Sequence, residues 1–340
     1  MRSSPGTSYR VVIVGTGGIS RAHARVCQQN DQTDLVAVCD VSQAAADSFA
    51  QQFAVDRTYT VLEEMLDKER IDIAITCTGA VYQPAVAIQI AESGRVKTLL
   101  CEKPLSQTAA DAEALIAACR NNGVLVAEGW KFRHHPQHLK AKQIIEAGGI
   151  GDVMHILSTF YSRFKDRRPT TSRFIKSVGG GAVRWMGCYN LHHALWIFGE
   201  EPERVYAVKM PGVEVDDAAS VLLTFSGGRT ALISAGHNSW DSEIAEILGT
   251  SGLLRTDKAF GVDSQVMGDL EHHTVDGVAR YQFKPADSFG LQLQHLLECL
   301  ESDQPHRVTQ EQSIAHMKVI DAVFESFESD KPVALGSAHD

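Results

Sequence analysis

The sequence lacks several features that would assign it to a specialised class. No stretch approaches the roughly 18 continuous apolar residues of a membrane span, and the polar N-terminal residues do not resemble a secretory signal. With a formal net charge of −10 and no dense basic run, the chain is a poor candidate for binding nucleic acid or anionic membranes. We interpret one small basic cluster, Lys165, Arg167 and Arg168, as a solvated loop, with a phosphate contact as the alternative. These absences favour a globular protein, and we expect a cytoplasmic location.

Disulfide and metal patterns are missing as well. The seven cysteines are odd in number and widely spaced, with no Cys-x-x-Cys pair, which argues against a disulfide framework or a zinc ribbon. The spacing of His134, His135 and His138 suggests zinc, but no carboxylate or cysteine completes the set and no His-Glu-x-x-His is present. We therefore expect these histidines, and His272 and His273, to be solvated or structural, and we expect no metal site.

The length of 340 residues favours two domains, and the hydrophobic pattern changes after residue 127. Residues 1–127 alternate short apolar runs with helical stretches, which is typical of a buried parallel sheet covered on both faces. We predict a doubly wound sheet with strands at Val11–Val14, Leu35–Cys39, Ile71–Thr76, Thr98–Cys101 and Val124–Ala127.

Residues 128–340 follow a different rhythm. After a predicted helix at Gln137–Ala147, long strand-like stretches extend from residue 153 to residue 248, with Ser226-Gly227-Gly228 as a hairpin turn between two of them. One helix, Asn190–Phe198, interrupts the strands, and helices over residues 289–302 and 310–329 close the chain. This pattern predicts an α+β domain with a large open, mainly antiparallel sheet. One face of such a sheet needs a cover, so we expect a homodimer or homotetramer formed through it.

A glycine-rich segment follows the first predicted strand and begins the first helix. Its glycines permit a tight turn and a close approach of backbone N–H groups to a pyrophosphate, which would face the helix N-terminus. The third position of the dinucleotide-binding pattern is Ser20 here, a small departure. We assign cofactor contacts to Gly15, Thr16, Gly17, Gly18 and Ile19.

Two further positions fit a dinucleotide site. Asp40 ends the second predicted strand, where a carboxylate accepts hydrogen bonds from the adenosine ribose and repels a 2′-phosphate. NAD is therefore favoured over NADP, and a strand-end turn is the alternative role of Asp40. Thr78 and Gly79 follow the Ile71–Thr76 strand at the carboxyl edge of the sheet, so we expect cofactor contact there rather than a plain turn. The first domain is thus predicted to be a Rossmann domain.

The segment Cys101-Glu102-Lys103-Pro104 carries a family resemblance. Glu-Lys-Pro after the fifth parallel strand resembles the glucose–fructose oxidoreductase and inositol dehydrogenase family, abbreviated Gfo/Idh/MocA. Further motifs follow in the family's order and spacing, so the likeness spans nearly the whole chain: Glu128–Gln137, Glu146–Gly151, Gly179–Ala182, Val215–Ala218 and Gly249–Gly252.

The resemblance implies hydride exchange between NAD and a sugar, cyclitol or related polyol. It implies that Lys103 lies near the nicotinamide and bonds the reacting hydroxyl, where an ammonium stabilises a developing alkoxide. Glu102 would orient this lysine and belong to the cofactor site, and the peptide before Pro104 is often cis in the family. A surface lysine beside a turn is the alternative for Lys103.

The second half of the family's site is altered in this chain. Where most members have Asp, His and Asp, the sequence has Trp185, Tyr189 and His192. Gly187-Cys188-Tyr189 resembles a subgroup in which tyrosine is the proposed acid–base residue, and Lys103 nearby would favour the phenolate. A core tyrosine is the alternative.

Four further residues are candidates on the substrate side. His192 lies one helical turn from Tyr189 and could relay its proton, or be a histidine capped by a neighbouring carbonyl. Trp185 could offer an apolar platform to a sugar ring or pack in the core. Arg133 and Arg163 lie in segments that line the cleft in relatives, with a surface salt bridge or turn as the alternative.

Three functions compete on this sequence. The first is an NAD-dependent dehydrogenase in which Tyr189 removes the hydroxyl proton with help from Lys103. The second is a glycoside hydrolase that oxidises its substrate transiently, and the third is a non-catalytic dinucleotide-binding protein, suggested by the missing Asp at position 185. Because Lys103 and Tyr189 are both retained, the dehydrogenase ranks first.

Overall fold

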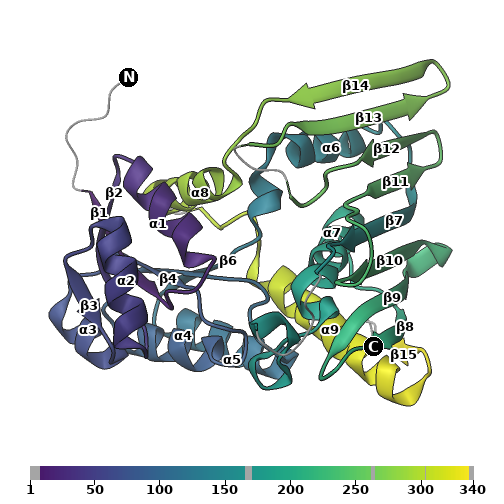
Figure 1. The fold of residues 1–340 in the computed structure, drawn as a ribbon. Coiled ribbons are helices and arrows are strands. Elements are labelled where there is room, and N and C mark those ends of the chain that lie inside the picture. Colours follow the sequence, from purple (N-terminus) through teal and green to yellow (C-terminus); the bar gives the residue numbers. More distant parts are fainter. Residues whose placement is uncertain (1–7, 165–170, 262–264, 303, 337–340) are drawn as a thin grey trace. The chain divides into compact units, whose positions relative to one another are not determined.

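The computed structural model describes residues 8–164, 171–261, 265–302 and 304–336, so the basic cluster Lys165, Arg167 and Arg168 lies outside the described part. The chain forms two compact units (Figure 1). Unit 1 comprises Met1–Lys131 and Phe289–Ser313, and unit 2 comprises Phe132–Ser288 and Ile314–Asp340. Among the described residues, no helix has the length and apolarity needed to cross a membrane.

Unit 1 contains a parallel sheet with buried central strands. Runs of Val, Ile and Leu form such strands because both faces of the sheet are covered. In the described residues every strand pair is parallel, and the order β3-β2-β1-β4-β5-β6 confirms the predicted doubly wound sheet. The strands are β1 (Tyr9–Val14), β2 (Thr33–Cys39), β3 (Arg57–Tyr59), β4 (Ile73–Thr76), β5 (Thr98–Cys101) and β6 (Leu125–Glu128).

Helices connect these strands. Two of them begin at side-chain caps, because the hydroxyls of Ser42 and Thr108 accept hydrogen bonds from backbone N–H groups of the first turn. Strand β3 and the short helix that follows it were not predicted from the sequence. The helices are α1 (Ser20–Gln29), α2 (Gln43–Phe53), α3 (Leu62–Lys68), α4 (Gln83–Glu92) and α5 (Ala109–Asn121).

A helix from late in the sequence, α8 (Ser288–Ser302), belongs to unit 1 and lies beside α1 (Figure 1). Its Leu293, Leu296 and Leu297 share one helix face and pack into the buried cluster that contains Val11 and Ile13 of β1. The division of the chain at residue 127, drawn from the hydrophobic pattern, stays a prediction. Each compact unit combines two separate stretches of chain.

Unit 2 contains a mixed sheet. Within the described residues its order is β14-β13-β12-β11-β7-β10-β9-β8-β15, with β7 and β10 parallel and the other neighbours antiparallel. This confirms the predicted mainly antiparallel sheet, and Ser226–Gly228 joins β9 to β10 as expected. The strands are β7 (Val153–Tyr161), β8 (Arg204–Pro211), β9 (Asp216–Thr224), β10 (Thr230–Gly236), β11 (Ala245–Gly249), β12 (Gly252–Thr256), β13 (Gly268–Thr274), β14 (Gly277–Phe283) and β15 (Val333–Ala334).

Helices of unit 2 pack on this sheet. Helix α6 (Pro136–Glu146) contacts β13 and β14, and α7 (Cys188–Phe198) contacts β7 and β10. A π-helical turn, Val183–Gly187, leads directly into α7. The last helix, α9 (Gln310–Ser329), has most of its length in unit 2.

Candidate active site

The glycine-rich loop after β1 is tight at its base and open at its tip. Gly15 has φ +90°, and a Cβ there would lie 2.9 Å from the backbone of Cys77, so only glycine fits this turn. A Cβ on Gly17 or Gly18 would meet no atom within 4 Å. The tip therefore leaves room for a ligand to approach the backbone closely.

Helix α1 begins directly behind this loop, at Ser20. No side chain of the described residues caps its N-terminus at Ile19, and its first turn holds no acidic residue. Ser20 is buried, and its hydroxyl donates a hydrogen bond to the Gly17 carbonyl, so it braces the loop instead of capping the helix. Uncapped N–H groups at the positive end of the helix dipole attract anions. The loop thus fits the pyrophosphate of a dinucleotide.

Asp40 is held at the edge of this loop. The backbone N–H and the hydroxyl of Thr16 both donate to Oδ2 of Asp40, at 2.8 and 2.9 Å, and the Ser42 N–H donates to Oδ1 at 3.0 Å. Thr16 is buried, whereas Asp40 is partly exposed. Asp40 therefore shapes the turn after β2 and still presents carboxylate lone pairs at the surface.

The segment after β4 borders the glycine loop. A Cβ on Gly15 would lie 3.1 Å from the backbone nitrogen of Thr78, and Gly79 is exposed. The Thr78 hydroxyl oxygen is buried and has no hydrogen-bond partner within the described residues. A buried hydroxyl without a partner is uncommon, and a ligand bound at the adjoining loop would satisfy it.

The Lys103 loop, Glu102–Leu105, follows β5 and contains a cis peptide between Lys103 and Pro104. Buried Gln83 of α4 holds this loop through its side-chain amide. Its Nε2 donates to the Glu102 carbonyl and also approaches the carbonyls of Leu105 (3.1 Å) and Pro104 (3.4 Å). Its Oε1 accepts a hydrogen bond from the hydroxyl of Thr76 at 3.2 Å, which fixes the orientation of the amide. One side chain therefore binds the backbone on both sides of Lys103.

Glu128 holds the same loop from the end of β6. Its Oε1 accepts a hydrogen bond from the Leu105 N–H at 2.9 Å. Burial raises the pKa of Glu128 to about 7, opposed by hydrogen bonds with Ser313 and Trp130 and by the charge of Lys103. The Lys103 loop is thus in direct contact with a carboxyl group that titrates near neutrality.

Glu102 connects the Lys103 loop to α1. Its Oε1 lies 2.7 Å from Nε2 of His23, and its Oε2 accepts the Lys103 N–H at 3.2 Å. His23 is buried and packs edge-on against Phe289 of α8, with ring centres 5.1 Å apart. On this geometry Glu102 holds the backbone of Lys103.

Tyr189 lies in the first turn of α7, in unit 2, and is half-buried. Its ring packs against three phenylalanines, with ring-centre distances of 5.5 Å to Phe160, 5.6 Å to Phe260 and 6.0 Å to Phe132. These rings hold the phenol in a defined position.

His192 is buried one turn later in α7. Its Nε2 lies 3.1 Å from NH1 of Arg133, and because guanidinium only donates, Nε2 must be the acceptor. Burial, with the charge of Arg133 next in weight, lowers the pKa of His192 well below its usual range. The imidazole is therefore neutral with its proton on Nδ1. Arg133 is itself buried, with its guanidinium 4.1 Å from the ring centre of Trp196.

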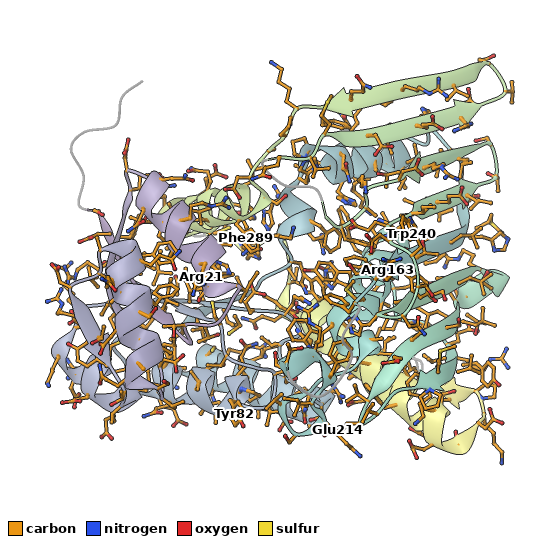
Figure 2. All side chains as sticks on the ribbon, in the orientation of Figure 1. Arg21, Tyr82, Arg163, Glu214, Trp240 and Phe289 are labelled. Atoms are coloured by element: carbon orange, nitrogen blue, oxygen red, sulfur yellow. The ribbon has the colours of Figure 1, made fainter. Side chains whose placement is uncertain are left out.

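The other predicted substrate contacts have different surroundings in unit 2. Trp185 is half-buried in the π turn, with the guanidinium of Arg173 at 4.9 Å from its ring centre. Arg163 is exposed and lies over the ring of Trp240 at 5.1 Å, and Figure 2 shows these two labelled residues close together. The predicted substrate roles of Trp185, Arg163, Arg133 and His192 stay predictions.

Asp216 anchors the start of the π turn. Its Oδ2 accepts the Val183 N–H at 2.7 Å, and Gly181, with φ +120°, lies so close that a Cβ there would overlap the carboxylate. Burial raises the pKa of Asp216 to about 6, opposed by the Val183 N–H and the charge of Arg184. Two motifs singled out in the sequence, Gly179–Ala182 and Val215–Ala218, are therefore in direct contact.

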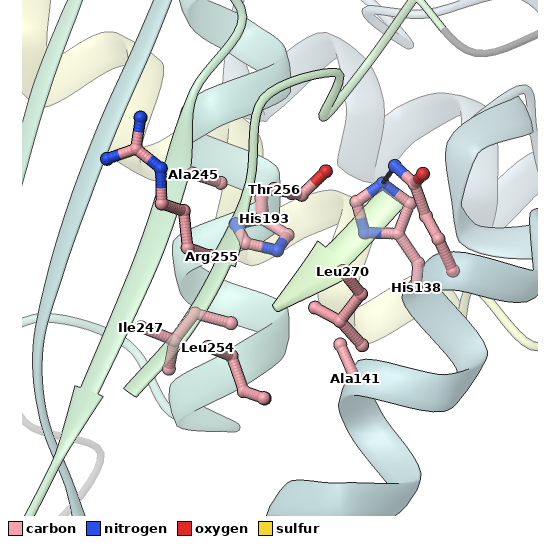
Figure 3. Close-up of a pocket in the computed structure, with 10 residues that line it drawn as sticks. His138, Ala141, His193, Ala245, Ile247, Leu254, Arg255, Thr256 and Leu270 are labelled. Carbon is pink, nitrogen blue, oxygen red and sulfur yellow. Dashed lines mark hydrogen bonds between the residues drawn. The ribbon is translucent and has the colours of Figure 1, made fainter. Parts of the chain in front are cut away.

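His138 of α6, His193 of α7 and His272 of β13 have structural surroundings. His138 and His193 help to line a small pocket, from which the Arg255 guanidinium points away (Figure 3). Its volume of about 10 Å³ holds at most one water. His138 Nε2 lies 2.5 Å from the Ala259 carbonyl, and His272 Nε2 lies 2.8 Å from that of Gly149. In the part of the chain that the structure describes, no three His, Cys, Asp or Glu side chains could hold a metal ion together.

Several residues that hold these sites in place were not predicted from the sequence. Glu128 and Asp216 lie inside motifs that were recognised in the sequence. Their contacts with Leu105 and Val183, however, could not be predicted from those motifs. Gln83, His23 and Arg173 belong to no recognised motif. These residues are identified by their closeness to their partners in the folded chain, and the spacing of residues in the sequence does not reveal that closeness.

Comparison with known proteins agrees with this fold. Residues 9–130 match the family model described as "Oxidoreductase family, NAD-binding Rossmann fold", and residues 138–255 match the "GFO/IDH/MocA C-terminal domain". The D-xylose 1-dehydrogenase (NADP(+)) 2 of Haloferax volcanii is 28% identical over 95% of this chain and 98% of its own. The myo-inositol 2-dehydrogenase of Thermotoga maritima is 25% identical over 96% of this chain and 98% of its own.

A solved structure has the same fold. The aldose–aldose oxidoreductase from Caulobacter crescentus, complexed with glycerol, gives a TM-score of 0.87 at 22% identity and covers 96% of this chain and 100% of its own. The two family models together span more than half of the sequence, in the order of the two predicted domains. The protein is therefore a member of the Gfo/Idh/MocA family, an oxidoreductase whose N-terminal Rossmann sheet is built to bind a nicotinamide dinucleotide.

Proposed function

We propose that this protein is an NAD-dependent dehydrogenase that interconverts a hydroxyl and a carbonyl group on a sugar, cyclitol or related polyol. The observation that carries this proposal is the Lys103 loop. It lies at the carboxyl end of β5, in the same unit as the glycine loop, and Gln83 and Glu128 hold its backbone. The relatives named above, a xylose and an inositol dehydrogenase, support the substrate class. When bound, the nicotinamide supplies the redox chemistry.

The chain's own residues handle the proton in this proposal. Tyr189 takes the proton of the substrate hydroxyl, and the Lys103 ammonium stabilises the negative charge that develops on oxygen. A phenol ordinarily titrates near about 10, so a neighbouring ammonium is needed to favour the phenolate. His192 would assist by donating a hydrogen bond from its Nδ1–H to the phenolate of Tyr189, since its Nε2 accepts from Arg133. Arg133, Arg163 and Trp185 would contact the substrate.

We also propose NAD rather than NADP as the preferred cofactor. Asp40 is held by Thr16 and Ser42 at the edge of the glycine loop, where its charge would repel a 2′-phosphate. The Haloferax relative is named for NADP(+), so members of this family differ in this preference. In this scheme residues 1–127 bind the nucleotide and residues 128–340 bind the substrate and a partner subunit.

The test is nicotinamide absorbance with a panel of sugars and inositols. Lys103→Ala and Tyr189→Phe should lower turnover by about 100- to 10,000-fold while NADH binding, followed by fluorescence, persists. Lys97→Ala and Tyr281→Phe change the same residue types elsewhere and should leave turnover unaltered. Tight NAD binding without turnover of any panel member would contradict the proposal. Glycoside cleavage without net NADH formation would instead favour transient oxidation.

The open face of the unit 2 sheet supports the expected oligomer. An apolar groove of about 450 Å³ crosses β7, β10, β9 and β8, and Leu232 and Val208, which line it, are 51% and 46% exposed. Exposed apolar surface of this extent favours association, and a second copy of the chain offers the same face. We propose a homodimer or homotetramer through this face. Leu232→Glu should dissociate this oligomer, and light scattering should then report a lower molar mass than for the wild type.

We propose the cytoplasm as the location. The cysteines are free in the structure, which suits a reducing compartment. Cell fractionation with a tagged chain would test this.

A further inference from the structure

Arg173 of unit 2 contacts two aromatic rings. It lies in a short 3-10 turn, Ser172–Phe174, and its guanidinium is 4.1 Å from the ring centre of Phe164 and 4.9 Å from that of Trp185. A planar cation against aromatic faces is attracted to them and loses little freedom when it binds a further ligand.

The backbone of Arg173 is fixed as well. Its carbonyl oxygen accepts the N–H of Gly181 at 2.9 Å, and a Cβ on Gly180 would lie 2.7 Å from the same oxygen. Glycine at these positions lets the segment that leads into the π turn approach Arg173 closely. The guanidinium and Trp185 are thus placed together by the same short stretch of chain, so a ligand meets a preorganised site.

Within the described residues, Arg173 has no carboxylate partner. Two other arginines of unit 2 do have carboxylate partners: Arg229 pairs with Glu200, and Arg255 pairs with Glu246 and Asp257. Burial lowers the pKa of Arg173, and no acid of the described residues opposes this effect. A half-buried guanidinium without an ion pair retains N–H donors for a ligand.

The chemistry of the expected ligand follows from this arrangement. A stacked guanidinium presents its N–H groups in the ring-parallel plane, in a fork that matches the two oxygens of a carboxylate. One guanidinium balances one carboxylate, whereas a phosphate monoester carries about −1.5 to −2 charges at neutral pH. The face of Trp185 suits the C–H face of a sugar ring.

We propose that Arg173 binds a carboxylate of the substrate, so that acidic sugars such as uronic or aldonic acids are the preferred substrates. This inference rests on the proposed dehydrogenase function. It makes Arg173 a specificity-determining residue that was not predicted from the sequence.

The first test compares D-glucuronate with D-glucose, and D-galacturonate with D-galactose, as substrates with NAD. Each pair differs only at C6. The uronate should have the higher kcat/KM, and Arg173→Met should lower kcat/KM for the uronates by about 10- to 100-fold while sparing the neutral sugars. Arg229→Met removes an aromatic-stacked arginine that already has a carboxylate partner, and it should leave the preference intact. Equal or better turnover of neutral sugars by the wild type would overturn the proposal, as would an equal loss on both substrates in Arg173→Met.

Binding separates this proposal from the dehydrogenase function. If no sugar is turned over, the proposed function fails, and thermal denaturation with NAD and D-glucuronate then tests Arg173 alone. Glucuronate should raise Tm of the wild type and not of Arg173→Met, and the absence of any rise in the wild type overturns the carboxylate site. A larger rise with glucose 6-phosphate overturns the choice of carboxylate over phosphate. Should Arg173→Met fail to fold, Arg173→Lys keeps the charge without the planar fork and should lose most of the uronate preference.

Discussion

The Leu105 N–H donates a hydrogen bond of 2.9 Å to Oε1 of Glu128, and thereby places the Lys103 loop against a carboxyl group with a pKa of about 7. Burial is the main cause of this raised pKa, so the folded chain holds the proton more tightly than the unfolded chain. The resulting stabilisation is fully present below the ordinary pKa of 4.5 and is lost as pH rises through about 7.

Glu128→Gln should remove this pH dependence. A neutral amide can still accept the Leu105 N–H, so between pH 4.5 and about 7 the wild type should lose up to about 3 kcal/mol relative to the variant. Urea unfolding at the two ends of this range measures the difference. Glu92→Gln, an exposed change on α4, is the control and should follow the wild type. A Glu128→Gln variant with the wild-type pH profile would show that the buried carboxyl does not titrate in this range.

Gln83→Glu should affect turnover more than cofactor binding. The variant replaces an amide donor with an oxygen that faces the carbonyls of Glu102 and Leu105, at a cost of about 1–3 kcal/mol per unsatisfied buried group. Because the glycine loop is untouched, kcat should fall while Kd for NADH stays near its wild-type value. Gln89→Glu makes the same change at an exposed position of α4 and should alter neither. Parallel losses of Tm and NADH affinity would indicate a general structural role instead.

Gly181→Ala should destabilise the segment that leads into α7. The new Cβ would overlap the Asp216 carboxylate and would adopt an unfavourable φ of +120°. Gly148 also has a positive φ, of +74°, but a Cβ there meets nothing within 4 Å. Gly148→Ala is therefore the control: it measures the cost of a positive φ alone, roughly 1 kcal/mol, without the overlap with a carboxylate that Gly181→Ala creates. Chemical denaturation should rank Gly181→Ala as more destabilising by about 1–3 kcal/mol, and equal losses would show that Asp216 moves away without cost.

Hydrophobic runs predicted most of the secondary structure because burial on both faces imposes a local pattern. The predicted helix over residues 310–329 and the predicted strand at Thr98–Cys101 have the observed bounds. The strands β13 and β14 were missed because apolar and polar residues alternate poorly along them, and the residues of β14 are largely exposed. The turn Val275-Asp276 joins them, and the Asp276-Gly277 dipeptide at its end is a hairpin signal that the sequence does contain.

The site was predictable where function imposes a motif and not where folding brings distant residues together. The glycine loop, Asp40 and Lys103 were found from short patterns at strand ends. The pairing of His23 with Glu102 joins positions 79 residues apart, and Gln83 lies 22 residues from the Leu105 carbonyl that it approaches. Arg173 has no motif at all, since its role depends on two rings that reach it from different elements. Such contacts follow from packing, which a single sequence does not display.

Thr16 should tune the cofactor preference through Asp40. Its hydroxyl supplies one of the hydrogen bonds that orient the Asp40 carboxylate, so Thr16→Val should weaken NAD binding by about 3- to 10-fold, whereas Thr16→Ser should retain it. Asp40→Asn removes the charge itself and should narrow the gap between NAD and NADP by at least about 10-fold. The ratio of kcat/KM for the two cofactors, together with NADH and NADPH affinities from fluorescence, measures both effects. If Thr16→Val weakens NADH and NADPH equally, its hydroxyl braces the loop and Asp40 does not depend on it. If the Thr16 hydroxyl instead orients the Asp40 carboxylate, Thr16→Val should leave NADPH affinity unchanged or raise it. A fall or a rise in NADPH affinity therefore decides between bracing the loop and orienting Asp40.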